Sequence, residues 1–108
     1  MAMKTQLTRG LKRRLMYIEN KNGEIDGARA RIGWAEFSKT GQSVYYRGKT
    51  LQKNGGQGVR GNFIDTSTGE EYWVSGLKRR GSNVHWADHV SVAIDQDALE
   101  AYRAIRSV

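Results

Sequence analysis

The sequence contains no cysteine and no proline. The absence of cysteine excludes disulfide bonds and metal sites built from thiolates. Long hydrophobic runs are also missing, since none approaches the roughly 20 residues that a membrane-spanning helix needs. The N-terminal residues lack the apolar stretch of a secretory signal. We therefore expect a cytoplasmic protein with no membrane partner.

The motifs of common enzyme classes are missing as well. The 108 residues contain no Gly-x-Ser-x-Gly motif, no phosphate-binding glycine loop and no dinucleotide-binding fingerprint. The adjacent carboxylates of Glu70 and Glu71 point to opposite faces of a strand, so they cannot act as a pair. Asp95 and Asp97 are explained by the start of a helix. We therefore expect a protein that is not an enzyme and uses no cofactor.

One cluster resembles a metal or acid–base site, namely His85, Asp88 and His89. A helix would place both histidines on one face, but they lead directly into the alternating apolar pattern of a strand. Four residues of extended chain span roughly 13 Å, which is too far for one ion. We therefore predict no metal site.

Positive charge is the strongest feature that is present. Lysine and arginine number 18 against 11 acidic residues, which gives a formal net charge of +7. The last 25 residues hold two of the bases and four of the acids, so the surplus lies in the first 83. Residues 1–14 hold five bases and no acid, and we predict that they form a basic N-terminal arm. Leucines at 7, 11 and 15 favour a short helix there, whereas Gly10 favours a flexible segment.

From residue 15 onward the pattern is typical of short strands separated by turns. Turns are predicted at Asn22-Gly23, at Thr40-Gly41 and at Thr66–Gly69. In the second strand the apolar residues change faces near Gly33, which indicates a bulge or a sharp coil. The predicted strands cover residues 15–19, 28–38, 43–51, 59–65, 71–77 and 90–94.

The last segment predicts one helix, at about residues 96–107. Asp95 can act as its N-cap, and Ile94 and Leu99 are placed as a hydrophobic staple across the cap. We predict a mainly β protein with a single small domain at 15–108. It has five or six antiparallel strands, which form an SH3-like bent sheet or a partly open barrel, and one C-terminal α-helix.

Aromatic residues are interleaved with the bases. A small barrel with both on its outer face can stack nucleobases and neutralise phosphates. Successive residues on a strand point to opposite faces, so one member of Tyr45/Tyr46 and one of Tyr72/Trp73 belongs to the core. We predict contact with nucleic acid, either RNA or DNA, through phosphate-binding Arg47, Lys49, Lys78, Arg79 and Arg80 and through stacking by Tyr46 or Trp86.

A second interpretation fits the same residues. Tyrosine, tryptophan and arginine dominate the hot spots of protein interfaces, so the aromatics could anchor a protein partner. The protein would then be an interaction module such as an antitoxin, an immunity protein or an inhibitor. An independent alternative to phosphate binding by Lys78–Arg80 is that this run is only a solvated hairpin tip that opposes edge aggregation.

Several segments resemble a family of small bacterial proteins of unknown function. They are residues 16–19, 30–33, 37–41, Tyr-Tyr-Arg-Gly at 45–48 and Gly-Glu-Glu-Tyr-Trp-Val-Ser-Gly at 69–76. Some members of the family carry the label deoxyxylulose-phosphate synthase, but a chain of this length without a diphosphate-binding motif could not house that thiamine-dependent reaction. The likeness covers roughly residues 16–105 and leaves out the basic arm. It implies a bacterial source and a cytoplasmic location, argues against an enzyme and supplies no site residues.

Overall fold

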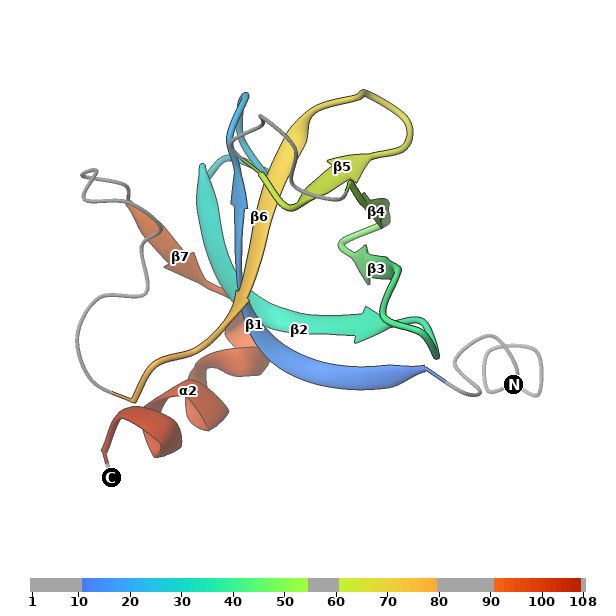
Figure 1. Cartoon of the computed structure of the whole chain (residues 1–108). Coiled ribbons are helices and arrows are strands. Elements are labelled where there is room, and N and C mark those ends of the chain that lie inside the picture. Colours follow the sequence, from blue (N-terminus) through green and yellow to red (C-terminus); the bar gives the residue numbers. More distant parts are fainter. Residues whose placement is uncertain (1–10, 55–60, 80–90, 108) are drawn as a thin grey trace, which may run out of the picture.

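The computed structural model describes residues 11–54, 61–79 and 91–107. Within these residues the chain forms seven strands, a short 3-10 helix and an α-helix (Figure 1). The strands are β1 (Lys12–Asn20), β2 (Ala30–Phe37), β3 (Ser43–Tyr46), β4 (Lys49–Lys53), β5 (Phe63–Asp65), β6 (Glu71–Gly76) and β7 (Val92–Ile94). The helices are η1 (Gln96–Ala98) and α2 (Leu99–Arg106).

The first six strands form a closed barrel. Each strand from β1 to β6 pairs antiparallel with the next, and β6 pairs back with β1. The short β7 is added outside the barrel, where it pairs parallel with β2. The predicted mainly β domain with antiparallel strands and one C-terminal helix is therefore confirmed. The pairing of β6 with β1 closes the sheet further than the predicted bent or partly open form.

Successive side chains on a strand point to opposite sides, and around Tyr17 and Ile32 the pair of β1 and β2 is covered on both faces. One face fills the barrel, where Ile18 and Ala35 pack with a core of apolar residues from the other barrel strands. The other face forms a smaller cluster of Tyr17, Ala30 and Ile32, against which Tyr102 of α2 packs. The helix is thus attached to the outside of the barrel by apolar contacts.

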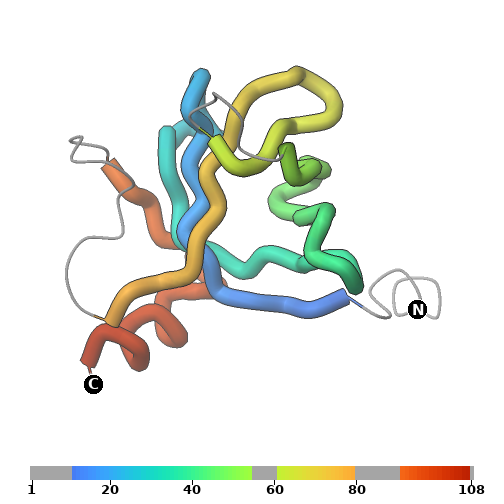
Figure 2. The backbone as a smooth tube through the Cα atoms, in the orientation of Figure 1, coloured from blue at the N-terminus to red at the C-terminus, as the bar shows by residue number. Residues whose placement is uncertain are grey.

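The change of face near Gly33 in β2 is not caused by a bulge. The pairing of β1 with β2 runs without interruption from Lys12–Phe37 to Glu19–Ala30. The backbone of β2 instead bends sharply as it follows the barrel wall (Figure 2). Of the two predicted explanations, the sharp coil is the one that the structure contains.

Two predicted turns are confirmed and one is wrong. Gly41 and Gly69 both have a φ of 78°, as the turns at 40–41 and 66–69 require. The predicted turn at Asn22-Gly23 has no positive φ, and the tip of that hairpin lies at Asp26-Gly27, with φ values of 47° and 92°. The reason is local: the Asn20 side chain accepts a hydrogen bond from the Asn22 amide, which holds residues 20–22 in a bend before the tip.

The predicted single strand at 43–51 is two strands. Tyr46 and Lys49 pair across a two-residue turn at Arg47-Gly48, where φ is 47° and 77°. Turns with two positive φ angles match the twist of a hairpin, but they favour Asn-Gly or Asp-Gly. Arginine is uncommon in the left-handed region, so the pattern gave no strong turn signal here.

The ends of the chain differ in two respects from the prediction. Strand β1 begins at Lys12, so three bases assigned to the arm belong to the barrel; residues 1–10 lie outside the described part of the chain. Asp95 stands at the start of η1, but its side chain makes no capping hydrogen bond, contrary to the prediction, because stronger donors face it. Neither described helix is long and apolar enough to span a bilayer.

Gly33→Ala is expected to lower the free energy of unfolding by about 1–3 kcal/mol, the usual effect of overpacking. The added Cβ would overlap Asp95 Oδ2 and would lie 2.8 Å from the Tyr46 hydroxyl oxygen. Urea unfolding followed by tryptophan fluorescence measures the change. The matched control is Gly76→Ala, whose Cβ would have no described atom within 4 Å. Equal losses in the two variants would contradict the expected clash.

Candidate functional site

One end of the barrel is closed by a group of polar side chains, which we call the polar plug: Arg31, Tyr46, Arg47 and Asp95. The Tyr46 hydroxyl donates a hydrogen bond of 2.5 Å to Asp95 Oδ2. Arg31 Nη1 lies 3.1 Å and Arg47 Nη1 lies 3.3 Å from Asp95 Oδ1. The Asp95 carboxylate therefore has a tyrosine and two arginines as partners, although only 8% of the residue is exposed.

Arg47 is fixed by two carboxylates. Its Nε donates a hydrogen bond of 2.7 Å to Asp26 Oδ2, while its guanidinium also reaches Asp95. The hydrogen bond with Asp26 raises the pKa of Arg47 and lowers the pKa of Asp26. The side chain that was predicted to bind phosphate is thus already neutralised within the protein, and it holds the turn in its left-handed conformation beside the plug.

The structure separates the other predicted site residues into two places. Lys49 stands in the same hairpin as Arg47, whereas Lys78 and Arg79 follow β6 beside α2, in a distant part of the molecule (Figure 1). Arg106 Nη1 donates a hydrogen bond of 2.9 Å to the Lys78 carbonyl oxygen, which fixes that location. Arg80, Trp86 and the cluster His85, Asp88 and His89 lie outside the described residues.

One member of each aromatic pair belongs to the barrel core, as predicted. Tyr46 is 3% exposed and Tyr72 is fully buried, so both belong to the barrel core. Tyr45 is 37% exposed, and Trp73 packs against the outer cluster. With its ring in the core and its hydroxyl on Asp95, Tyr46 offers no free face for stacking. Tyr45 is the member of the pair that a ligand can reach.

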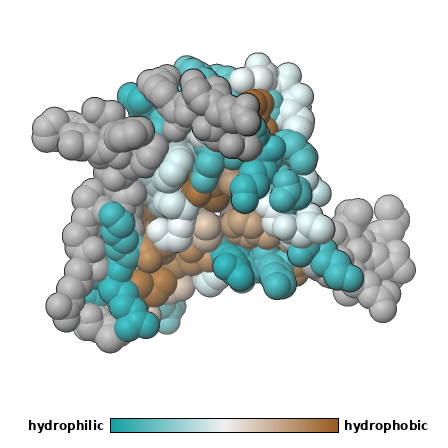
Figure 3. Space-filling view, in the orientation of Figure 1, coloured by the Kyte–Doolittle hydropathy of each residue, from teal (hydrophilic) through white to brown (hydrophobic). Residues whose placement is uncertain are grey.

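The opposite end of the barrel opens into a basic cavity of about 380 Å³. We call it the barrel mouth and define it by four bases, Lys12, Arg14, Lys39 and Lys53, and by the apolar residues Phe37, Phe63 and Val74. None of the residues that line it in the described part of the chain is acidic. Figure 3 shows hydrophobic surface, in brown, near the centre of the view, bordered by hydrophilic residues in teal.

The geometry of the strands brings these bases together. Lys12 and Arg14 alternate with Arg13 along β1, and they continue the row of inward-facing residues that includes Met16 and Ile18. The guanidinium carbon of Arg14 lies 6.0 Å from the centre of the Phe37 ring. Within the described residues, none of the four mouth bases forms an ion pair with a carboxylate. The run of three consecutive bases, Lys12 to Arg14, favoured an arm in the sequence and gave no strand signal.

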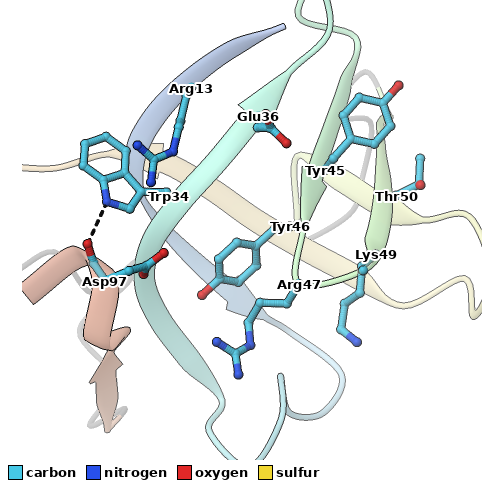
Figure 4. A pocket seen from close by; sticks show the side chains of 10 residues that line it. Arg13, Trp34, Glu36, Tyr45, Tyr46, Arg47, Lys49, Thr50 and Asp97 are labelled. Carbon is cyan, nitrogen blue, oxygen red and sulfur yellow. Dashed lines mark hydrogen bonds between the residues drawn. The ribbon is translucent and has the colours of Figure 1, made fainter. Parts of the chain in front are cut away.

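A second cavity, of about 460 Å³, lies on the outside of the same strands. We call it the outer groove, and the residues that line it include Arg13, Trp34, Glu36, Tyr45, Lys49 and Asp97. Trp34 Nε1 donates a hydrogen bond of 3.0 Å to the Asp97 carbonyl oxygen, and the Arg13 guanidinium carbon stands 4.2 Å from the Trp34 ring centre. Figure 4 shows Tyr45 on the other side of Glu36 from this pair.

The chemistry of the two cavities differs. The barrel mouth combines four bases that have no ion-pair partner among the described residues with an apolar floor, which suits a phosphate attached to a flat or apolar group. The outer groove has charges of both signs and exposed ring surfaces, which suits a ligand with donors, acceptors and a planar body. In the described part of the chain no group of three His, Cys, Asp or Glu side chains is placed to hold a metal ion.

No protein-family model, no curated protein and no solved structure matches the chain. The resemblance to a bacterial family therefore stays a prediction. The function must be inferred from the side chains and from their geometry.

Tyr46→Phe is expected to change how stability depends on alkaline pH. Burial, followed by the hydrogen bond to Asp95, raises the pKa of Tyr46 above its ordinary value of 10.0. Above pH 10 the unfolded chain loses this proton while the folded protein keeps it, so the free energy of unfolding falls as the pH rises. The variant loses about 1.5–3 kcal/mol at neutral pH, because a hydrogen bond to a charged group is removed.

The measurement is urea unfolding at several pH values between 8 and about 11.5. The variant should show a shallower decline above pH 10 than the parent. The free energy of unfolding of the variant should still fall somewhat with rising pH, because burial also raises the pKa of Tyr72 to about 12. Identical slopes in parent and variant would show that Tyr46 is not protonated and buried as described.

Proposed function

We propose that the protein binds single-stranded nucleic acid at the barrel mouth and is not an enzyme. The observation that carries the proposal is the set of four bases around an apolar floor, with no acid among the described residues that line it. The proposal keeps the nucleic-acid partner predicted from the sequence, but it moves the phosphate contacts to Lys12, Arg14, Lys39 and Lys53.

The charges of the mouth favour an anionic ligand. Four cations that share one cavity repel one another, and the barrel wall between them has a lower dielectric constant than water. A phosphate that enters the cavity relieves this repulsion and releases the counterions of the nucleic acid. Lys12 and Arg14 are exposed and continue the inward-facing row of β1, so their charged groups can reach a phosphate in the mouth.

The floor of the mouth favours single strands. The exposed part of Phe37 offers a surface on which a base can stack, and such contacts add about 1–3 kcal/mol per base. A cavity of about 380 Å³ is at the small end of the range for ligand sites and suits one nucleotide at a time. A duplex keeps its bases stacked inside, so it would offer only its phosphates to the rim.

Lys39→Gln combined with Lys53→Gln is expected to weaken the binding of a labelled single-stranded oligonucleotide about tenfold at 50 mM salt. Each phosphate contact on a single strand contributes about 0.7 to the slope of log affinity against log salt. The double variant should therefore reduce the slope by about 1.4. Fluorescence anisotropy between about 50 and 200 mM salt measures both quantities, with a duplex of the same sequence for comparison.

The matched control is Arg103→Gln combined with Arg106→Gln, which removes the same charge from α2, outside the mouth. It should change the affinity about twofold or less. Equal losses in both double variants would mean that binding reflects net charge alone. If no oligonucleotide binds, and a protein partner is recovered in fixed stoichiometry, the protein is instead the interaction module considered above.

A further inference from the structure

We propose that the outer groove is a base-reading subsite that prefers guanine. This inference rests on the proposed function, since it assigns a second contact to the same nucleic-acid ligand. It concerns selectivity between bases, whereas the barrel mouth contributes affinity through phosphates. The feature that carries it is the carboxylate of Glu36, which stands between the Arg13–Trp34 pair and the Tyr45 ring and has no partner among the described residues.

The position of Glu36 is set by the strand register. In this register Arg13 is opposite Glu36, Glu36 is opposite Tyr45, and Tyr45 is opposite Thr50. These four residues form one row across β1 to β4 on the outer face of the barrel. Glu36 is half-buried in this row, and among the described residues it forms neither an ion pair nor a side-chain hydrogen bond. A carboxylate in such a place has both oxygens free to accept hydrogen bonds from a ligand.

Planar surfaces stand on both sides of this carboxylate. On one side the Arg13 guanidinium lies over the Trp34 ring, whose orientation is fixed by the hydrogen bond to the Asp97 carbonyl oxygen. Arg13 is exposed, so the outer face of its guanidinium plane is open to a base. On the other side the Tyr45 ring is 37% exposed (Figure 4). Bases stack on guanidinium planes and on aromatic rings in this way.

The nucleobases differ in the hydrogen-bond donors that they can offer to the two oxygens of the carboxylate. Guanine presents two adjacent donors on its Watson–Crick edge, the N1–H and the 2-amino group, and these match the two oxygens of a carboxylate. Adenine and cytosine place an acceptor beside their amino group, and uracil and thymine place a single N–H between two carbonyls. Guanine is therefore the base that meets both oxygens of Glu36 without repulsion. Lys49, at the rim of the groove, is available to a neighbouring phosphate.

The test uses four ten-residue oligonucleotides of uridine, or of thymidine if DNA binds more tightly, that differ only at one central position. That position holds guanine, hypoxanthine, adenine or uracil/thymine. Hypoxanthine keeps the N1–H but lacks the 2-amino group, so it isolates the second hydrogen bond. Guanine should bind about tenfold more tightly than hypoxanthine, because a bidentate pair discriminates by about that factor or more.

Glu36→Gln should reduce this preference to about twofold or less, since the amide presents one donor and one acceptor. Glu100→Gln on α2 is the matched control, because it changes the net charge equally at an exposed position outside the groove. A second variant, Tyr45→Leu, should weaken binding of all four oligonucleotides while it leaves the salt dependence unchanged. Urea unfolding of each variant confirms that the barrel remains folded.

The possible failures are distinguishable. Equal affinity for guanine and hypoxanthine in the parent protein, with salt-dependent binding that the mouth variant weakens, would overturn the guanine subsite and leave the proposed function standing. If Glu36→Gln kept the full preference for guanine over hypoxanthine, the Glu36 carboxylate would likewise be excluded as the group that selects guanine. Absence of oligonucleotide binding under all conditions would overturn both proposals.

Discussion

The arrangement of the molecule depends on one buried carboxylate, that of Asp95. It joins the segment before the helix to the barrel through Tyr46 and Arg31, and it reaches the hairpin turn through Arg47. A charge removed from water is costly unless hydrogen bonds and opposite charges surround it, and here three donors do so. The carboxylate approaches the barrel wall at Gly33, where any side chain would displace it. One glycine, one acid and their partners thus fix where the C-terminal segment attaches.

The way one end of the barrel is closed explains why the other end can be open. The polar plug closes one end and the apolar core fills the middle, so the side chains at the other end do not have to be buried for the barrel to fold. Inward-facing positions there can hold Lys12 and Arg14 without loss of the core, because their charged groups extend into water while their stems cover apolar residues. A different buried charge, Glu19, lies on the outer face with Lys21 at 3.0 Å and the Tyr17 hydroxyl at 2.6 Å. The barrel therefore has an apolar interior, a buried and paired carboxylate on its outer face, and bases around its open end.

Local pattern was sufficient for the location of most strands, the turns at Gly41 and Gly69, and the assignment of one member of each aromatic pair to the core, because alternation and turn chemistry are encoded by neighbours. It was not sufficient for Asp95, which looks like a helix cap until its partner Tyr46, 49 residues away, is brought beside it. The turn at Arg47 was not predicted, because it too depends on contacts between residues that are distant in sequence. Its unusual backbone angle is held by Asp26 and Asp95, which are distant in sequence. The sequence placed Lys12 and Arg14 in an arm because nothing local shows that they pair with Phe37 and Ala35 of β2.

The proposed phosphate contacts and the proposed base contact lie on opposite faces of the pair of β1 and β2, so affinity and selectivity would come from different surfaces. Phosphate contacts supply affinity that depends on salt, and base contacts supply selectivity. Lys12 and Arg14 face the mouth while Arg13 faces the outer groove, so a shift of β1 by one residue would exchange the two sets. The register of β1 against β2 is pinned by cores on both faces of the pair, in which Ile18 and Tyr17 are fully buried. The packing that makes the barrel stable therefore also keeps the proposed phosphate contacts and the proposed base contact on separate surfaces.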